Sequence, residues 1–235
     1  MSNIRLYYPD SIVENSTSLL SKDHTHYLVN VMRAKRGLNV NFFNINGEWL
    51  SEIIFLDRDR VEVKFLKKIK NASRQANIEL AICLVKKTPM EIIIQKSTEL
   101  GVTKFSPIIS ERTEVKEINI ERARKIAIEA TEQSNQTHVP EISKPTKLKD
   151  FLNNLKEKKL LFADINSKNK INKKTIQNQK RISVLIGPEG DFSSNEREII
   201  NTNKNVIPFS LSKNILRTDT ATISTLSIIS YFLNL

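Results

Sequence analysis

Hydrophobic and polar positions divide the chain into two parts with different patterns. In residues 1–70, short apolar runs are separated by polar turns, which is typical of antiparallel strands. The runs lie at residues 5–8, 40–43, 49–54 and 61–65. Asn46 and Gly47 lie between the second and third runs and predict a hairpin turn, because both residue types accept positive φ. We therefore expect a small β-barrel or β-sandwich here.

One helix is expected to interrupt these strands. Residues 23–34 place Leu28, Val31 and Met32 on one helical face. The following polar stretch, residues 67–77, has no periodicity and suits a linker. These features predict a first domain at residues 1–72 and a second at residues 73–235.

From residue 78 onward, strand-like and helix-like segments alternate, which is typical of an α/β layer with a largely parallel sheet. Strands are expected at residues 78–84, 105–109, 160–163, 182–186 and 206–211, and the Lys- and Asn-rich residues 166–181 are expected to form a surface excursion. Thr88 is expected to cap a helix that ends at Gly101, with Pro89 in its first position and Glu91 closing a capping box. Further helices are expected at residues 119–133, from Ser193 onward, and at residues 223–233.

The charge of the chain changes this picture by suggesting a partner. Thirty-seven Lys and Arg against 26 Asp and Glu give a formal charge of +11, which attracts polyanions. Nucleic acid is therefore the leading partner class, although a basic solvated surface explains the charge equally well.

Cysteine and histidine are too scarce for a disulfide or a zinc site. Cys83 is the single cysteine, and His24, His26 and His138 are scattered along the chain. No run of 18 apolar residues and no secretion signal occur. We expect no bound metal and no membrane association, and a cytoplasmic location.

The sequence Gly187-Pro188-Glu189-Gly190 directly follows an expected strand. Two residues without side chains flank a rigid proline, so this turn can bring bare backbone close to a ligand. The fingerprints of NAD enzymes and of P-loop NTPases are both absent. By itself the turn is explained more simply as a tight connection between elements.

The turn gains meaning from four other segments at residues 26–33, 96–102, 129–134 and 215–221, the last reading Ile-Leu-Arg-Thr-Asp-Thr-Ala. In order and spacing, these motifs resemble the RsmE family of the SPOUT superfamily. Members methylate N3 of a uridine in the decoding region of 16S rRNA, uracil-1498. The resemblance implies a PUA-like RNA-binding β-barrel domain, a methyltransferase domain with a C-terminal trefoil knot, S-adenosylmethionine as cofactor, and a homodimer acting on 16S rRNA within the small ribosomal subunit.

The resemblance also implies a cofactor site made of three loops. Its residues would be Ala163, Asp164, Ile186, Gly187, Pro188, Glu189, Gly190, Leu211, Ile215, Leu216, Arg217 and Thr218. Leu211, Ile215 and Leu216 would wall the adenine, although apolarity alone fits an ordinary core equally well.

Three residues are candidates for catalysis. Arg217 would stabilise the uridine anion that forms when N3 loses its proton, and Asp219 or Glu189 would orient the base or accept that proton. Two of them equally suit simpler roles: Arg217 could bind a phosphate or a carboxylate of the partner subunit, and Asp219 could only stabilise a helix N-terminus.

Five residues are candidates for contacting RNA, although each is also explained as a solvated side chain. These are Arg33, Lys35, Arg36, Arg112 and Gln133.

The chain departs from the family pattern at Asp191, Ser212 and Asn214, and at Asn135 and Gln136, where an arginine is usual. These departures affect local loop shape and RNA contacts. Two other functions also fit: a SPOUT methyltransferase acting on tRNA or 23S rRNA, and a non-catalytic RNA-binding accessory protein.

Overall fold

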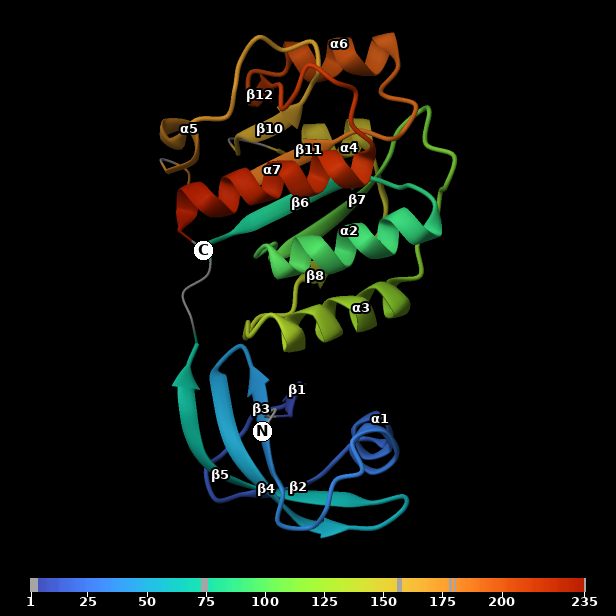
Figure 1. Cartoon of the computed structure of the whole chain (residues 1–235). Coiled ribbons are helices and arrows are strands. Elements are labelled where there is room, and N and C mark those ends of the chain that lie inside the picture. Colours follow the sequence, from blue (N-terminus) through green and yellow to red (C-terminus); the bar gives the residue numbers. More distant parts are fainter. Residues whose placement is uncertain (1–3, 73–75, 156–157, 178, 180, 235) are drawn as a thin grey trace. The chain divides into compact units, whose positions relative to one another are not determined.

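The structure is a computed structural model that describes residues 4–72, 76–155, 158–177, 179 and 181–234. The chain divides into two compact units (Figure 1). The first contains the N-terminal residues up to 72 and also residues 131–139. The second contains the described residues of 76–130 and 140–234.

The first unit is built on a five-stranded sheet with the order β1-β3-β4-β5-β2. The strands are β1 (Arg5–Tyr7), β2 (Thr17–Leu19), β3 (Asn39–Asn44), β4 (Gly47–Leu56) and β5 (Val61–Asn71). β1 pairs with β3 in parallel, and the other pairs are antiparallel. Phe42, Phe65 and Leu28 are fully or almost fully buried in its core. The four expected strands are confirmed, and β2 is an addition.

The expected linker at residues 67–77 is partly wrong. β5 continues to Asn71 and pairs with β4 as far as Gly47. The side chains at the end of β5 are all exposed, so no alternation in the sequence revealed the strand. Residues 73–75 of that expected linker lie outside the described residues.

The hairpin between β3 and β4 is confirmed, but its turn residues are Ile45 and Asn46. Gly47 begins β4 with a φ of 140°, whereas Asn46 has no positive φ. A Cβ atom on Gly47 would lie 2.3 Å from the carbonyl oxygen of Lys70. Close backbone approach, in addition to φ, therefore requires this glycine.

The helix expected at residues 23–34 is shorter and changes type. Helix α1 (Lys22–His26) continues as the π-helix η1 (Tyr27–Val31), and the Met32 amide donates to the Tyr27 carbonyl at 2.9 Å. This wider turn breaks the 3.6-residue period, so Leu28 is buried whereas Val31 is 59% exposed and Met32 is 37% exposed. The expected apolar face is wrong for those two residues.

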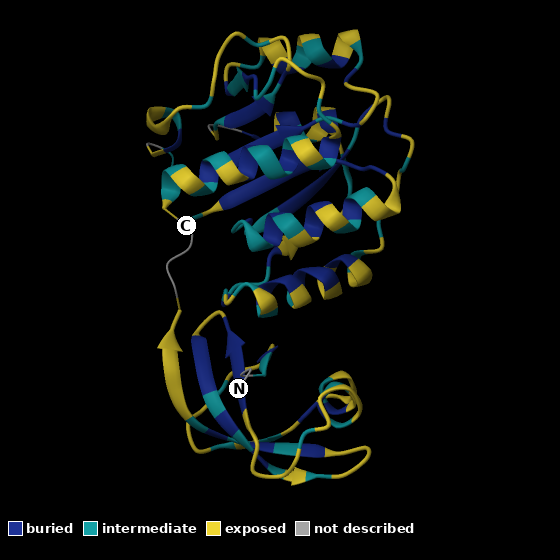
Figure 2. Cartoon of the chain, in the orientation of Figure 1, coloured by how far each residue is buried: buried dark blue, intermediate teal, exposed yellow. Residues whose placement is uncertain are grey.

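The second unit contains a parallel sheet, as expected. Its order is β12-β10-β11-β6-β7-β8, with β9 also paired to β7. The strands are β6 (Ile78–Cys83), β7 (Lys104–Ile109), β8 (Glu141–Ile142), β9 (Thr146–Lys147), β10 (Leu160–Ala163), β11 (Ile182–Ile186) and β12 (Val206–Phe209). The central strands β6 and β11 are buried throughout, as Figure 2 shows in dark blue.

Six helices accompany this sheet in the described residues. They are α2 (Lys87–Glu99), α3 (Ile120–Gln133), α4 (Leu148–Asn153), α5 (Lys173–Gln177), α6 (Ser194–Thr202) and α7 (Thr218–Leu233). Helices α2 and α7 lie side by side across the sheet (Figure 1). None of these described helices has the length and apolarity needed to cross a membrane.

Four helix boundaries test the sequence predictions. The capping box of Ser193 and Glu196 is confirmed at the start of α6. Helix α2 starts at Lys87 after the cap residue Lys86, so the predicted Thr88 cap and capping box are wrong. Gly101, with a φ of 88°, does follow the end of α2. Helix α7 begins at Thr218, five residues before the expected start. The prediction was too late because the first turns of α7 carry polar Thr residues and lack the apolar pattern of the later turns.

Candidate functional site

A cavity of about 340 Å³ opens at the carboxyl ends of β10 and β11. Ligands of open α/β sheets bind at this edge. Two loops far apart in the sequence line it, one following Ile186 and the other following Phe209. The lining residues are Ala163, Asp164, Ile165, Ile186, Gly187, Pro188, Glu189, Gly190, Asp191, Arg197, Leu211, Ser212, Asn214, Ile215, Leu216, Thr218 and Ala221.

The structure therefore brings almost all of the predicted cofactor residues to one cavity. Of the twelve named from the sequence, only Arg217 is not among the lining residues. The cavity volume falls in the range typical of small-molecule sites.

The turn at residues 187–190 is held on both sides. Arg112 donates from Nη1 to the Gly190 carbonyl at 3.0 Å. Thr218, the first residue of α7, donates from Oγ1 to the Gly187 carbonyl at 3.2 Å. A Cβ atom on Gly187 would lie 2.9 Å from Cε2 of the buried Phe192 ring, so this position has no room for a larger residue. The Thr218 bond joins the two loops of the cavity directly.

The backbone conformation at residue 191 explains how the chain can depart from the family pattern with an aspartate at this position. Its φ is 58°, the left-handed region that glycine adopts without strain and that Asp and Asn tolerate best among other residues. Its Oδ1 accepts a hydrogen bond from the Phe192 amide at 2.7 Å, and its Oδ2 accepts one from Arg197. The aspartate therefore keeps the backbone shape that a glycine would give.

Arg197 links the end of β10 to the turn after β11. Besides contacting Asp191, it donates from Nη1 to Oδ1 of Asp164 at 2.9 Å. Burial alone would lower the pKa of Arg197, but hydrogen bonds and charge attraction from Asp191 and Asp164 raise that pKa above its ordinary value. The guanidinium is a permanent positive charge between two carboxylates. Nothing in the single sequence marked Arg197, which is the main residue that sequence reasoning missed.

The position of Arg197 depends on the start of α6. The Ser193 hydroxyl accepts from the Glu196 amide at 3.2 Å, and the Glu196 carboxylate accepts from the Ser193 amide at 3.1 Å. The same carboxylate, 6% exposed, also accepts from the Glu111 amide at 2.8 Å. These bonds fix the first turn of the helix that carries Arg197.

The second loop combines exposed apolar residues with local polar bonds. Ile215 is 90% exposed, which excludes it from an ordinary core, while Leu211 and Leu216 are half-buried. The Ser210 hydroxyl donates to the Ser212 carbonyl at 3.1 Å, and the Asn214 amide donates to the Ser212 hydroxyl at 3.0 Å. The departures at Ser212 and Asn214 therefore shape this loop from within.

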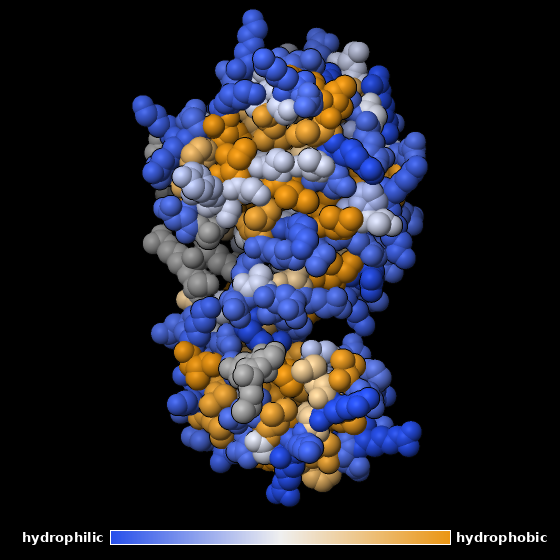
Figure 3. All heavy atoms as spheres, in the orientation of Figure 1, coloured by the Kyte–Doolittle hydropathy of each residue, from blue (hydrophilic) through white to orange (hydrophobic). Residues whose placement is uncertain are grey.

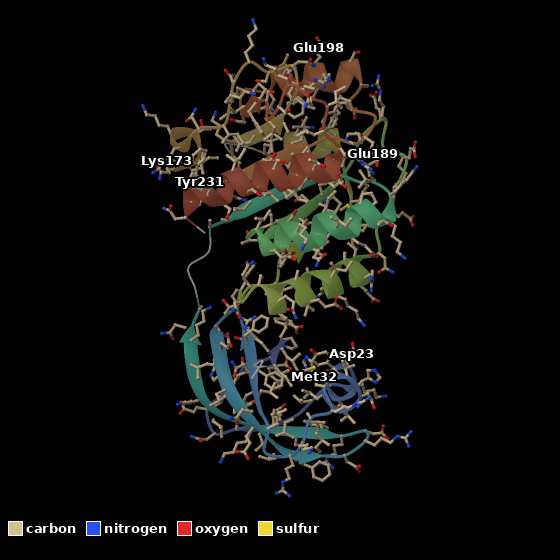
Figure 4. All side chains as sticks on the ribbon, viewed as in Figure 1. Asp23, Met32, Lys173, Glu189, Glu198 and Tyr231 are labelled. Carbon is tan, nitrogen blue, oxygen red and sulfur yellow. The ribbon has the colours of Figure 1, made fainter. Side chains whose placement is uncertain are left out.

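The three predicted catalytic residues differ in their positions. Glu189 is exposed and lines the cavity, near the first turn of α7 (Figure 4). Arg217 is the exposed N-cap of α7, and its side chain makes no hydrogen bond or ion pair with another described residue. Asp219 is half-buried in the first turn and accepts from the Thr220 amide at 2.7 Å. Arg217 and Asp219 flank Thr218 but do not line the cavity.

The predicted RNA contacts are divided between the two units. Arg33, Lys35 and Arg36 are exposed in the first unit, and Arg33 has a φ of 49°. Gln133 is exposed at the end of α3. Arg112 belongs to the second unit, where its bond to Gly190 gives it a structural role as well.

A buried arginine holds the segment that carries the departures at Asn135 and Gln136. Arg5 donates to the carbonyls of Thr131 at 3.1 Å, of Glu132 at 3.3 Å and of Gln136, and it pairs with Glu48 at 2.9 Å. The Asn135 carbonyl accepts from Lys70 at 3.2 Å. Within the segment, Asn135 has a φ of 59°, which Asn tolerates better than most residues, and the Gln136 side chain donates to the Ser134 hydroxyl at 3.1 Å.

Within the described ranges, no group of three or more His, Cys, Asp or Glu residues is placed to hold a metal ion. Cys83 is buried, and burial raises the pKa of its thiol to about 12. This cysteine is therefore a core residue with no reactive thiolate at neutral pH.

Two family profiles match the chain. The RNA methyltransferase domain family matches residues 71–230, and the RNA methyltransferase PUA domain family matches residues 20–66. The second unit, and the part of the first unit that contains β3, β4 and the beginning of β5, therefore correspond to two domain types that are known from RNA methyltransferases.

Individual relatives match over nearly the whole chain. The ribosomal RNA small subunit methyltransferase E of Rickettsia conorii is 32% identical over 95% of this chain and 93% of its own length. The crystal structure of the Neisseria gonorrhoeae protein of that name, bound to S-adenosylmethionine, has a TM-score of 0.89 and 27% identity, covering 97% of each chain. A putative methyltransferase of Legionella pneumophila, also with bound S-adenosylmethionine, has a TM-score of 0.86 and 29% identity, covering 98% of each chain. With its two profile matches and this full-length similarity, the chain belongs to the ribosomal RNA small subunit methyltransferase E family.

Proposed function

We propose that this protein transfers a methyl group from S-adenosylmethionine to N3 of a uridine in 16S rRNA. One observation carries the proposal: loops 187–191 and 211–218 converge on a single cavity and are joined by the Thr218 to Gly187 hydrogen bond. Two of the named relatives are small-subunit rRNA methyltransferases, and two of the named structures hold S-adenosylmethionine.

The residues present suit this cofactor. Leu211, Ile215 and Leu216 offer apolar surface for an adenine, and the turn from Gly187 to Gly190 offers backbone groups for hydrogen bonding. The lining carries three carboxylates, those of Asp164, Glu189 and Asp191, against the one guanidinium of Arg197, and this net negative charge suits the positive sulfonium and amino groups. When bound, the cofactor supplies an electrophilic methyl group.

The chain's own residues must activate the uridine. N3 becomes a good nucleophile only as its proton leaves, and the resulting negative charge spreads onto O2 and O4. We assign the stabilisation of this charge to Arg217, whose exposed guanidinium has no partner among the described residues. Glu189 is the better placed carboxylate to accept the N3 proton because it lines the cavity, whereas Asp219 is occupied at the helix start.

The proposal includes a homodimer acting on the small ribosomal subunit in the cytoplasm. Helix α7 carries exposed apolar surface, with Tyr231 78% exposed, and Ile92 of α2 is 39% exposed. Figure 3 shows apolar residues gathered on this face, over α7 and α2. Such a face favours burial against a second copy. We also propose that the C-terminal part of the second unit forms a trefoil knot, as the resemblance implies.

The competing functions make different predictions. A methyltransferase acting on tRNA or 23S rRNA would leave 16S rRNA unchanged in a strain that lacks this gene. An RNA-binding accessory protein would have no use for the cavity.

Mass mapping of methylated nucleotides in such a strain tests the proposal. We expect one uridine of 16S rRNA to lose an N3 methyl group and to regain it when the gene is restored. Loss of methylation in a different RNA, or no change, would refute the proposal. Restoration by an Arg217→Ala gene would refute the role of Arg217 alone.

A further inference from the structure

A second cavity, of about 460 Å³, lies beside the edge strand β12. Leu161 of β10 and Ile207, Pro208 and Phe209 of β12 form its apolar floor. Lys168 and Lys170 border it, together with Asn169 and Asn172. An apolar floor with a cationic and amide rim combines the features that recognise a nucleotide, because the floor suits a base and the lysines suit a phosphate.

The rim of this cavity is fixed in place by hydrogen bonds to the strand below it. The Ser210 amide donates to the Asn169 carbonyl at 2.8 Å, and the Ser167 hydroxyl donates to the Pro208 carbonyl at 3.1 Å. Ile176 of α5 is fully buried and anchors the far end of the segment. The Lys- and Asn-rich excursion is therefore a docked element of the fold.

The charge of this segment is one-sided. No Asp or Glu occurs between Asp164 and Glu189. Lys168 and Lys170 are exposed, as are Lys173 and Lys174 of α5, and Figure 4 shows Lys173 at the edge of the second unit. The only other described basic residue of the segment, Arg181, pairs with Glu79 at 2.9 Å. Among the described residues, none of these four lysines has an acidic partner, so their positive charges can attract an external anion.

The segment also adjoins the proposed cofactor site along the chain. It begins immediately after Asp164 and Ile165, and Lys170 lies 3.4 Å from the Ser210 hydroxyl, just before Leu211. An RNA strand that delivers a base to the first cavity would carry its neighbouring phosphates past this rim.

We infer that this second cavity is a substrate-binding site, in which Lys168 and Lys170 contact the RNA backbone of a nucleotide flanking the target uridine. The inference rests on the proposed function. It gives the excursion a role in RNA binding, although none of the five RNA-contact residues predicted from the sequence lies in this segment.

The test compares two double variants with the same change in charge and the same spacing. Lys168→Gln with Lys170→Gln alters the rim, and Lys147→Gln with Lys149→Gln alters two exposed lysines that do not border this cavity, one on β9 at the opposite edge of the sheet and one on α4. The affinity of each protein for a 16S rRNA transcript is measured at several salt concentrations, and its affinity for S-adenosylmethionine is measured by calorimetry.

Each lysine bound to a single-stranded phosphate contributes about 0.7 to the slope of log affinity against log salt. The rim variant should lose about 1.4 from that slope and bind RNA about 25-fold more weakly at 0.1 M salt. The control should match the wild type in RNA affinity, and both variants should keep their cofactor affinity.

A rim variant that binds RNA like the control would overturn the inference and leave the proposed function intact. A wild-type protein that neither binds nor methylates the transcript and small subunits would overturn the proposed function as well. If UMP competes with the transcript equally in the wild type and the rim variant, the lysines do not hold a phosphate, and the inference also fails.

Discussion

Arg197 offers the sharpest test of how the cofactor cavity is held together. Replacing it with Met removes the guanidinium but keeps an unbranched side chain of similar length. Asp164, whose side chain is 8% exposed, would lose its charged partner and keep only the hydrogen bond from the Asn166 amide at 3.0 Å. Asp191, 51% exposed, would be compensated by water.

The size of the effect follows from these exposures. A hydrogen bond to a charged group contributes about 1.5–3 kcal/mol, and a half-exposed ion pair contributes less than about 1 kcal/mol. We therefore expect Arg197→Met to lower the free energy of unfolding by about 2 kcal/mol, or about 4–8 °C in Tm. Because the turn must then be ordered when the cofactor binds, the affinity for S-adenosylmethionine should fall about 10- to 30-fold.

Denaturant unfolding and calorimetric titration measure the two effects. Asp191→Asn serves as the control, because Asn also tolerates a φ of 58° and can keep the bond from the Phe192 amide. It should cost less than about 1 kcal/mol. If Arg197→Met changes stability by no more than the control and leaves the affinity unaltered, the bridge between Asp164 and Asp191 does not support the cavity.

Three further predictions concern the turn, the reaction and the first unit. Gly187→Ala should lower both Tm and cofactor affinity, because the new Cβ would lie 2.9 Å from the Phe192 ring. Gly190→Ala is the control: its Cβ would lie 3.8 Å from the Arg112 side chain, an ordinary contact, and the variant should keep the wild-type Tm. Equal Tm values for the two variants would contradict this prediction. Arg217→Ala should reduce methyl transfer to small subunits by about 100-fold or more while leaving cofactor affinity unchanged in calorimetry, and near-normal turnover would remove Arg217 from the mechanism. Burial lowers the pKa of His24, against the opposing effects of the Tyr7 backbone and Asp23, so the unfolded chain binds a proton more readily than the folded chain. The contribution of neutral His24 to stability is therefore fully present above pH about 6.5 and is lost as the pH falls below that value. His24→Gln should flatten the decline of Tm between pH 7 and pH 5.5, whereas an unchanged decline would show that other groups cause it.

The sequence predicted those parts of the fold in which local pattern and tertiary environment agree. The buried strands β6 and β11 read as apolar runs interrupted only by Glu79 and Ser183, and the Ser193 and Glu196 spacing correctly located α6. The prediction missed the end of β5 because its side chains are all exposed, so apolar and polar residues do not alternate there. The predicted apolar face of the helix near Leu28 was wrong because the π-helical turn changes the 3.6-residue period on which the prediction depends.

The candidate site shows the same division between local and long-range information. The motif resemblance identified residues that line one cavity, including Gly187 and Thr218, although they are 31 positions apart. Arg197 could not be found in this way, because its partner Asp164 is 33 positions away and meets it only after β10 and β11 have paired. Asp191 was seen as a departure, but its left-handed φ became visible only in the structure.

The central claim is that the two C-terminal loops close around S-adenosylmethionine. Hydrogen exchange of the backbone amides, measured with and without the cofactor, tests it most directly, because both loops must be protected together. We predict slower exchange at residues 187–191 and 211–218 and little change in the first unit. Protection at only one of these loops, or at neither, would contradict the claim.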